Sequence, residues 1–125
     1  MNRKSEAEIM AGMVGRTFAE VTGSVGDEVM RFVDADGRGV RFYHEQSCCE
    51  NVLIEDVCGD IADLIGSPIL LAEAVSNMNG PELPDADSYT WTFYKFATIK
   101  GSVTVRWLGT SNGYYGEDVA VEELP

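Results

Sequence analysis

The stretch that decides the fold is SYTWTFYKFATIKGSVTVRWLGTSNGYY, residues 88–115. Residues 88–100 are rich in Thr, Tyr, Trp and Phe, and apolar side chains fall on both faces of the expected strand, which is typical of a central β-strand. Residues 102–108 alternate Val, Val and Trp with Thr, Arg and Leu, the pattern of a strand with one buried face. Asn112-Gly113 is a strong hairpin signal, so we expect residues 114–121 to return as the third strand of a meander.

A second hairpin is expected nearer the N-terminus. Residues 28–33 and 40–44 both alternate apolar and polar side chains, and Asp36-Gly37 lies in the loop between them. Three more strands are expected over residues 17–21, 51–57 and 69–75. A short apolar run such as the last of these fits strand or helix, and we favour strand.

Two short helices are expected beside the strands. Ser5 and Glu8 have the spacing of a capping box, which predicts a helix over residues 5–13 with Ile9, Met10 and Met13 on one face. Asp60 has the character of an N-cap for a shorter helix over residues 61–65.

These elements predict one β-rich domain of the α+β class over residues 1–125. Its sheet is expected to be mostly antiparallel, with an N-terminal hairpin, a C-terminal three-stranded meander and one or two short helices. Hydrophobic residues make up 45% of the chain, which is enough for one core. Residues 77–87 contain two prolines and an Asn-Gly pair, so we expect a mobile loop there.

The charge balance is strongly acidic. The formal net charge is −12, from 21 acidic and 9 basic residues. This argues against general binding to nucleic acid and against adhesion to an anionic membrane, since both need clustered Lys and Arg. A solvated acidic surface is the favoured interpretation. An acidic decoy of a DNA backbone is the second, weakened because the carboxylates are spread from Glu6 to Glu123.

The sequence also predicts a compartment. No stretch approaches the roughly 20 apolar residues of a membrane-spanning helix, and residues 1–15 do not form a convincing signal peptide. We therefore expect the protein in the cytoplasm, with its three cysteines as thiols.

The densest cluster of reactive residue types is HEQSCCE, residues 44–50, followed by Cys58. One hypothesis is a metal site of His44, Cys49 and Cys58, disfavoured because adjacent cysteines on a strand point to opposite faces. Another is a thiol nucleophile activated by His44, disfavoured because acidic neighbours raise a thiol pKa. The favoured interpretation is that the cysteines fill core gaps and that His44 ends a strand and bonds locally. With no phosphate loop or nucleophile elbow, we expect a non-enzyme without a cofactor.

Aromatic and cationic residues offer a ligand site. Such a set could stack a purine ring and hold a phosphate. The alternation places Arg106 on the face opposite Trp107, where it could anchor an anion. The tip over residues 111–115 fits a partner-binding loop and a plain hairpin turn equally well. The candidate contacts are Tyr94, Lys95, Arg106, Asn112, Tyr114 and Tyr115.

Four segments together resemble a family of small proteins encoded by bacteriophages and prophages. They are FYHEQSCCE (residues 42–50), IEDVCGD (54–60), SYTWTFYKF (88–96) and SNGYY (111–115). The resemblance covers about residues 14–124. It implies a setting in the bacterial host cell and brings no catalytic residues, because the family has no assigned activity.

The resulting expectation is a phage or prophage accessory protein that acts by stoichiometric binding. It would inhibit a host protein or sequester a nucleotide-like signal, as a counter-defence factor. Two alternatives stay open: a metal- or thiol-dependent protein centred on His44, Cys49 and Cys58, and a structural module that pairs through an exposed β edge. A homo-oligomer fits both the sequestering protein and the structural module.

Overall fold

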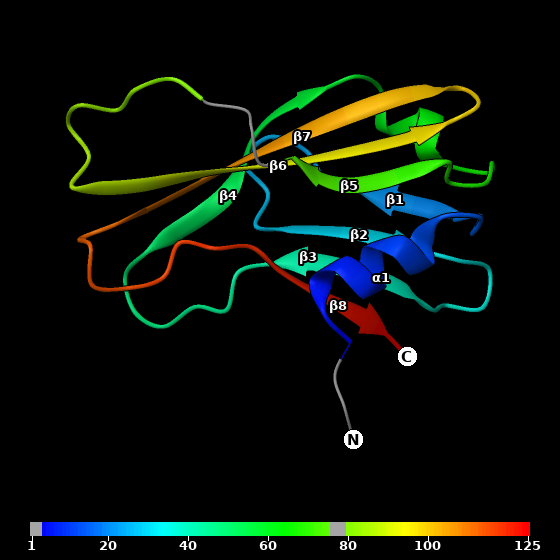
Figure 1. The fold of residues 1–125 in the computed structure, drawn as a ribbon, viewed down its shortest axis with the longest axis horizontal. Helices are drawn as coiled ribbons and strands as arrows, with labels where there is room; N and C mark the ends of the chain where they lie inside the picture. Colours follow the sequence, from blue (N-terminus) through cyan, green and yellow to red (C-terminus); the bar gives the residue numbers. More distant parts are fainter. Residues whose placement is uncertain (1–3, 76–79) are drawn as a thin grey trace.

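Within residues 4–75 and 80–125, the computed structural model has eight strands in two antiparallel four-stranded sheets (Figure 1). The first sheet has the order β1-β2-β3-β8, formed by β1 (Glu20–Thr22), β2 (Val29–Val33), β3 (Gly39–Tyr43) and β8 (Ala120–Leu124). The second has the order β4-β7-β6-β5, formed by β4 (Asn51–Cys58), β7 (Gly101–Ser111), β6 (Ser88–Thr98) and β5 (Leu71–Val75). With α1 (Glu6–Met13) and the 3₁₀ turn η1 (Ile61–Leu64), this confirms a mostly antiparallel, β-rich α+β fold.

The two sheets pack face to face around one aromatic core. Alternate residues of each strand point inward, so the facing rings meet across the interface. The ring centroids of Phe32 and Phe96, one from each sheet, lie 4.8 Å apart. Trp107 lies on the apolar face of the predicted alternation over residues 102–108, and its side chain is fully buried. The largest buried aromatics are Phe18, Phe32, Phe42, Tyr94, Phe96 and Trp107.

The β6–β7 hairpin forms the centre of the second sheet. Its register runs from Ser88↔Ser111 at one end to Thr98↔Gly101 at the turn. β6 lies between β5 and β7, which confirms the predicted central strand. β7 continues to residue 111, three residues beyond the predicted end.

The predicted third strand of the meander is wrong. β8 does not pair with β7 but crosses to the first sheet, where Val121 lies opposite Phe42 on β3. Arg41 and Glu122 face one another in that register and form an ion pair. Alternation in the sequence predicts a strand but not its partner, and here a neighbour of opposite charge was available on β3. Residues 112–119 therefore run from one sheet to the other.

The N-terminal hairpin and the short helices follow their local signals. β2 pairs with β3 as predicted, and the turn is held by Asp34, whose carboxylate accepts from the backbone N–H of Asp36 and Arg38. η1 begins after Asp60, which caps it as predicted, but it is a 3₁₀ turn. The strand predicted at residues 17–21 is shorter in the structure and lies later in the sequence, as β1 at Glu20–Thr22. Thr17 forms only an isolated bridge with Pro68.

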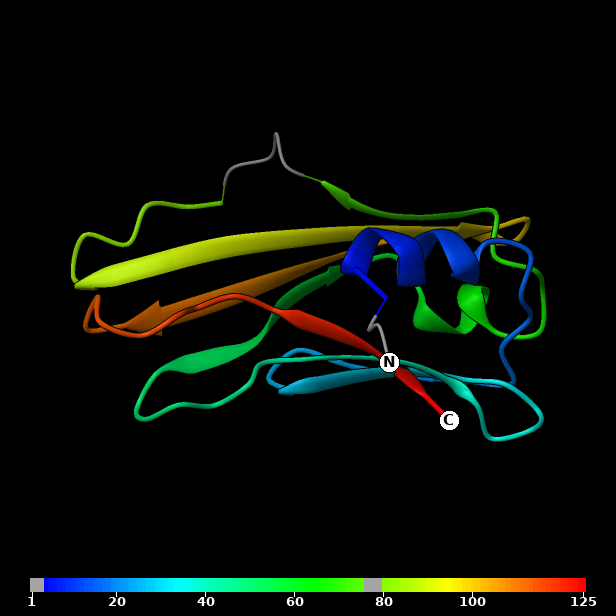
Figure 2. The same cartoon turned by 60° about the horizontal axis from the view of Figure 1, so that its bottom comes forward.

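Helix α1 closes the open side between the two sheets (Figure 2). It contacts both β5 and β8, the edge strands on that side. The predicted capping box of Ser5 and Glu8 is present. The apolar face of α1 is buried as predicted. The Tyr94 hydroxyl donates to a carboxylate oxygen of Glu6, 2.6 Å away. This bond ties the helix to the core.

Candidate functional site

The loop between β3 and β4 is organised around one buried carboxylate. The Glu50 side chain accepts the backbone N–H of Ser47 at 2.9 Å and of Cys48 at 2.8 Å. It also lies 2.9 Å from Nε2 of His44. The hydrogen bond to His44 and the backbone donors hold the pKa of the Glu50 carboxyl far below its usual range, at about 2. Residues 44–50 are thereby fixed as one unit.

His44 is held as a cation by its two hydrogen-bond partners. Nε2 faces the Glu50 carboxylate, and Nδ1 lies 2.6 Å from the carbonyl oxygen of Asp118. Both partners only accept, so both ring nitrogens must donate, which requires the imidazolium. Burial alone would lower the His44 pKa, but these two bonds outweigh it and raise the pKa above the ordinary value of 6.5. His44 directly follows β3 and bonds locally to Glu50 as predicted, but its second bond, to Asp118, reaches a segment far along the sequence.

The two adjacent cysteines are on the surface. The expectation that they fill core gaps is wrong, because Cys48, Cys49 and Cys58 are all exposed. Cys48 and Cys49 lie in a loop, where the alternation of a strand does not apply, and their Sγ atoms are 3.3 Å apart. The Tyr115 hydroxyl lies beside them, and its hydrogen bond with the Cys48 thiol raises the tyrosine pKa.

A second buried carboxylate fixes the crossing segment, residues 112–119. Glu117 accepts hydrogen bonds from Oγ1 of Thr90 at 2.8 Å and from Oγ of Ser111 at 2.5 Å. Burial would raise its pKa, but the hydroxyl donors outweigh burial and the Glu117 pKa is lowered. A Cβ at Gly109 would lie 2.4 Å from the Glu117 carbonyl oxygen, so the close approach requires glycine there.

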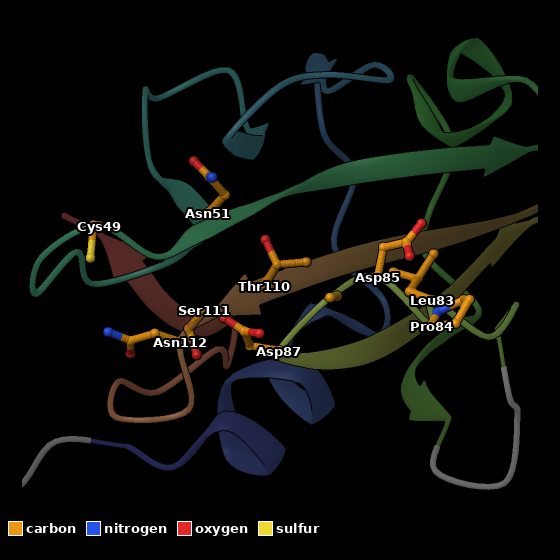
Figure 3. A pocket seen from close by; sticks show the side chains of 10 residues that line it. Cys49, Asn51, Leu83, Pro84, Asp85, Asp87, Thr110, Ser111 and Asn112 are labelled. Atoms are coloured by element: carbon orange, nitrogen blue, oxygen red, sulfur yellow. The ribbon is translucent and has the colours of Figure 1, made fainter.

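A groove of about 550 Å³ opens between these fixed segments (Figure 3). Cys49 and Asn51 come from the start of β4, Thr110 and Ser111 from the end of β7. The opposite wall is residues 83–87, which precede β6. Polar oxygen and nitrogen atoms from three parts of the chain therefore face one hollow.

The three segments around this groove contain carboxylates and no Lys or Arg. They are residues 43–51, 80–90 and 109–119, which we call the acidic end. His44 is the one cationic group in these segments, and Glu50 compensates it. The exposed carboxylates of the acidic end are Glu45, Glu82, Asp85, Asp87 and Asp118.

Comparison with known families finds a match for the chain. A family described as a domain of unknown function, DUF7448, matches residues 11–121. The chain belongs to this family. No curated protein and no solved structure matches it.

The DUF7448 match spans the acidic end and both sheets. It includes the four segments that resemble phage and prophage proteins, but the family description says nothing of phage origin. No helix in residues 4–75 and 80–125 is long and apolar enough to cross a membrane.

The six residues predicted to contact a nucleotide-like ligand do not form one site. Tyr94 is buried in the core, whereas Lys95 and Arg106 lie on the outer face of the second sheet. Arg106 is paired with Glu55 and lies over the ring of Trp91. Asn112, Tyr114 and Tyr115 are at the other end of β7, where Asn112 lines the groove and Tyr114 is 87% exposed.

The three residues of the metal hypothesis are also separated. His44 and Cys49 share the β3–β4 loop, but Cys58 ends β4 at the far side of its eight residues. At about 3.3 Å per residue, the strand places Cys58 roughly 25 Å from the loop. Among the residues that the structure describes, no three His, Cys, Asp or Glu side chains are placed to hold a metal ion.

The groove wall at residues 83–87 was not foreseen. The sequence predicted a mobile loop over residues 77–87, of which residues 77–79 lie outside the described residues. The described part packs on the sheet, with Trp91 Nε1 donating to the Pro81 carbonyl at 2.9 Å and Gly80 close against the Trp91 ring. The sequence signals for this contact were the Gly80-Pro81 pair and Trp91, which are ten residues apart.

Proposed function

We propose that this DUF7448 chain is a non-enzymatic binding protein that captures a basic surface of a partner protein at its acidic end. The observation that supports this most is the convergence of three segments, all without Lys or Arg, around one groove. The buried carboxylates of Glu50 and Glu117 fix two of these segments before any partner arrives. A preformed surface of this kind loses little conformational entropy on binding.

The groove chemistry favours a cationic group. Asp85 and Asp87 supply carboxylates on one wall, and the side chains of Asn51 and Thr110 supply further acceptors. A Lys ammonium or an Arg guanidinium donates several hydrogen bonds and accepts none, which suits such a lining. The partner would therefore place a Lys or Arg side chain in the groove.

The tip beside the groove favours a protein as the partner. Tyr114 is 87% exposed and Tyr115 is half-exposed at 37%. Exposed tyrosines are typical anchors of protein interfaces, because they bury a large area with few rotatable bonds.

A phosphate-bearing ligand has less support. Arg106, the predicted anchor, is engaged by Glu55, and the carboxylates of the groove repel anions. The resemblance to phage and prophage proteins supports an accessory role in the cytoplasm of a bacterial host. Inhibition of a basic host protein, including one that binds DNA, is the form of counter-defence that fits this surface.

Capture from a bacterial lysate with two charge-matched variants tests the proposal. The groove variant carries Glu82→Gln, Asp85→Asn and Asp87→Asn. The control carries Glu20→Gln, Asp36→Asn and Glu73→Gln, which are exposed and outside the acidic end. Each variant has a net charge of −9, from −12 plus 3.

The wild type and the control are expected to retain a basic protein at about a one-to-one ratio, and the groove variant is expected to lose it. Capture should weaken with added salt, because exposed charges are screened. Equal retention by both variants, or no stoichiometric partner, would refute the proposal.

A further inference from the structure

The Cys48–Cys49 pair has the geometry of two thiols that can react with one another. Their Sγ atoms are 3.3 Å apart and both residues are exposed. A disulfide needs a separation of about 2.05 Å. Closing the remaining difference needs rotation of both side chains and strains the short ring, because adjacent Cα atoms lie closer than in ordinary disulfides.

The backbone around the pair is held in place independently of the sulfur atoms. The Cys48 N–H donates to Glu50 at 2.8 Å, and the Cys48 carbonyl accepts from Nε2 of Gln46 at 3.1 Å. Glu50 in turn is fixed by His44. Because the loop is anchored by these bonds, the two thiols stay close together in the reduced protein.

A disulfide between neighbouring residues is readily reversed. Adjacent Cα atoms lie about 3.8 Å apart across a trans peptide, below the roughly 4.4 Å at which ordinary disulfides begin. The strained ring has a more oxidising potential than a structural disulfide, so modest thiol concentrations reduce it. Strained, exposed disulfides are the labile and regulatory ones.

We propose that Cys48 and Cys49 form a redox modification site, a vicinal dithiol that a small-molecule disulfide converts reversibly to a disulfide. One cysteine thiolate attacks the small disulfide and releases one thiol, leaving a mixed disulfide. The second thiolate then attacks the protein sulfur of that bond and releases the other thiol. The protein loses two electrons and two hydrogens, which the two released thiols carry.

The surroundings select the kind of disulfide. Asp85 and Asp87 line the same groove as Cys49, so a cationic disulfide is attracted and an anionic one is repelled. Contact with the Cys48 thiol raises the Cys49 pKa, and exchange is faster in mild base because the thiolate is the attacking form. The inference does not depend on the proposed partner.

Peptide-mass mapping after treatment with cystamine, a cationic disulfide, tests the inference. The peptide that holds residues 48 and 49 should lose the mass of two hydrogens in reduced wild type and in Cys58→Ser, and dithiothreitol should restore it. Cys48→Ser and Cys49→Ser lack the second thiol, so each should keep a stable cysteamine adduct. Glutathione disulfide, which is anionic, should react more slowly at low salt.

Three outcomes would overturn the inference. The first is a stable cysteamine adduct on Cys48 or Cys49 of the wild type. The second is a disulfide-linked dimer, and the third is a wild type whose mass at residues 48 and 49 does not change. Cys58→Ser separates these outcomes from chemistry at the distant thiol, since Cys58 ends β4.

Discussion

Nε2 of His44 lies 2.9 Å from a carboxylate oxygen of Glu50, and the exposed fractions of the two side chains are 6% and 0%. The same histidine bonds through Nδ1 to the carbonyl of Asp118. The ion pair joins the end of β3 to the start of β4, and the second bond of His44 joins both to the crossing segment. Two of the three segments of the acidic end, residues 43–51 and 109–119, are thereby connected.

Replacing Glu50 should destabilise the β3–β4 loop at this end of the molecule. Glu50→Gln loses the charge paired with His44 and weakens two backbone hydrogen bonds, whereas Glu45→Gln changes an exposed carboxylate of the same loop. Because removal of one partner leaves a buried charge unpaired, we expect Glu50→Gln to lower Tm by about 10 °C. Thermal unfolding followed by circular dichroism measures both variants. Equal, small shifts would show that Glu50 does not organise the loop.

The pKa of His44 should lie above the ordinary value for histidine. It is the one histidine of the sequence, so its Hε1 resonance can be followed without assignment. The hydrogen bonds to Glu50 and Asp118 favour the imidazolium, and we expect a midpoint above 6.5. Proton NMR across the neutral range gives this value. A midpoint at or below 6.5 would contradict the doubly bonded geometry.

The ion pair should stabilise the fold most at mildly acidic pH. The His44 pKa is raised on folding, so its contribution is complete below 6.5 and is lost as pH rises through the folded pKa. The Glu50 pKa falls from 4.5 to about 2, so its contribution is complete above 4.5 and is lost as pH falls towards 2. The stability difference between wild type and His44→Gln should therefore peak between 4.5 and 6.5. Urea unfolding at about pH 3, 5.5 and 9 measures it.

Local signals in the sequence were sufficient for most single elements. The capping box of Ser5, the N-cap of Asp60 and the Asp-Gly turn all act within a few residues, and each element formed where predicted. The pairing of β8 was missed because alternation defines a buried face and not a neighbour. The residues that meet in that pairing, such as Arg41 and Glu122, are far apart in the sequence.

The site was harder to predict for the same reason. The cluster at residues 44–50 was recognised as chemically dense, but burial of Glu50 and exposure of the cysteines depend on a loop conformation that no short motif specifies. Arg106 was correctly placed on the face opposite Trp107, and Lys95 lies on that same outer face. Their partners, such as Glu55, come from a neighbouring strand and could not be read from alternation.

Two glycines should respond to alanine in opposite directions. A Cβ at Gly109 would lie 2.4 Å from the Glu117 backbone oxygen, so Gly109→Ala should destabilise by more than about 3 kcal/mol. At Gly12, inside α1, a Cβ meets nothing within 4 Å, so Gly12→Ala should stabilise by about 0.5–1 kcal/mol. Urea unfolding measures both. A mild effect at Gly109 would mean that the crossing segment can shift away from the sheet.

The Arg106–Glu55 pair should contribute little to stability. Its side chains are 25% and 33% exposed, so solvent screens the interaction. A double-mutant cycle with Arg106→Ala and Glu55→Gln should give a coupling free energy below about 1 kcal/mol. Arg106→Ala should also leave capture of the basic partner unchanged, since Arg106 is outside the groove. Loss of capture in Arg106→Ala would move the binding surface to the outer face of the second sheet.

The most direct test of the proposed function is the affinity of the acidic end for a defined cationic probe. Fluorescence anisotropy of a labelled peptide, in which Arg and Lys alternate with Gly and Ser, gives Kd for the wild type and for the two variants of net charge −9. Binding at the groove predicts a Kd about 10-fold weaker for the groove variant and changed less than about 2-fold for the control. The same Kd for both variants would mean that net charge alone attracts the peptide, and would contradict a binding site at the acidic end.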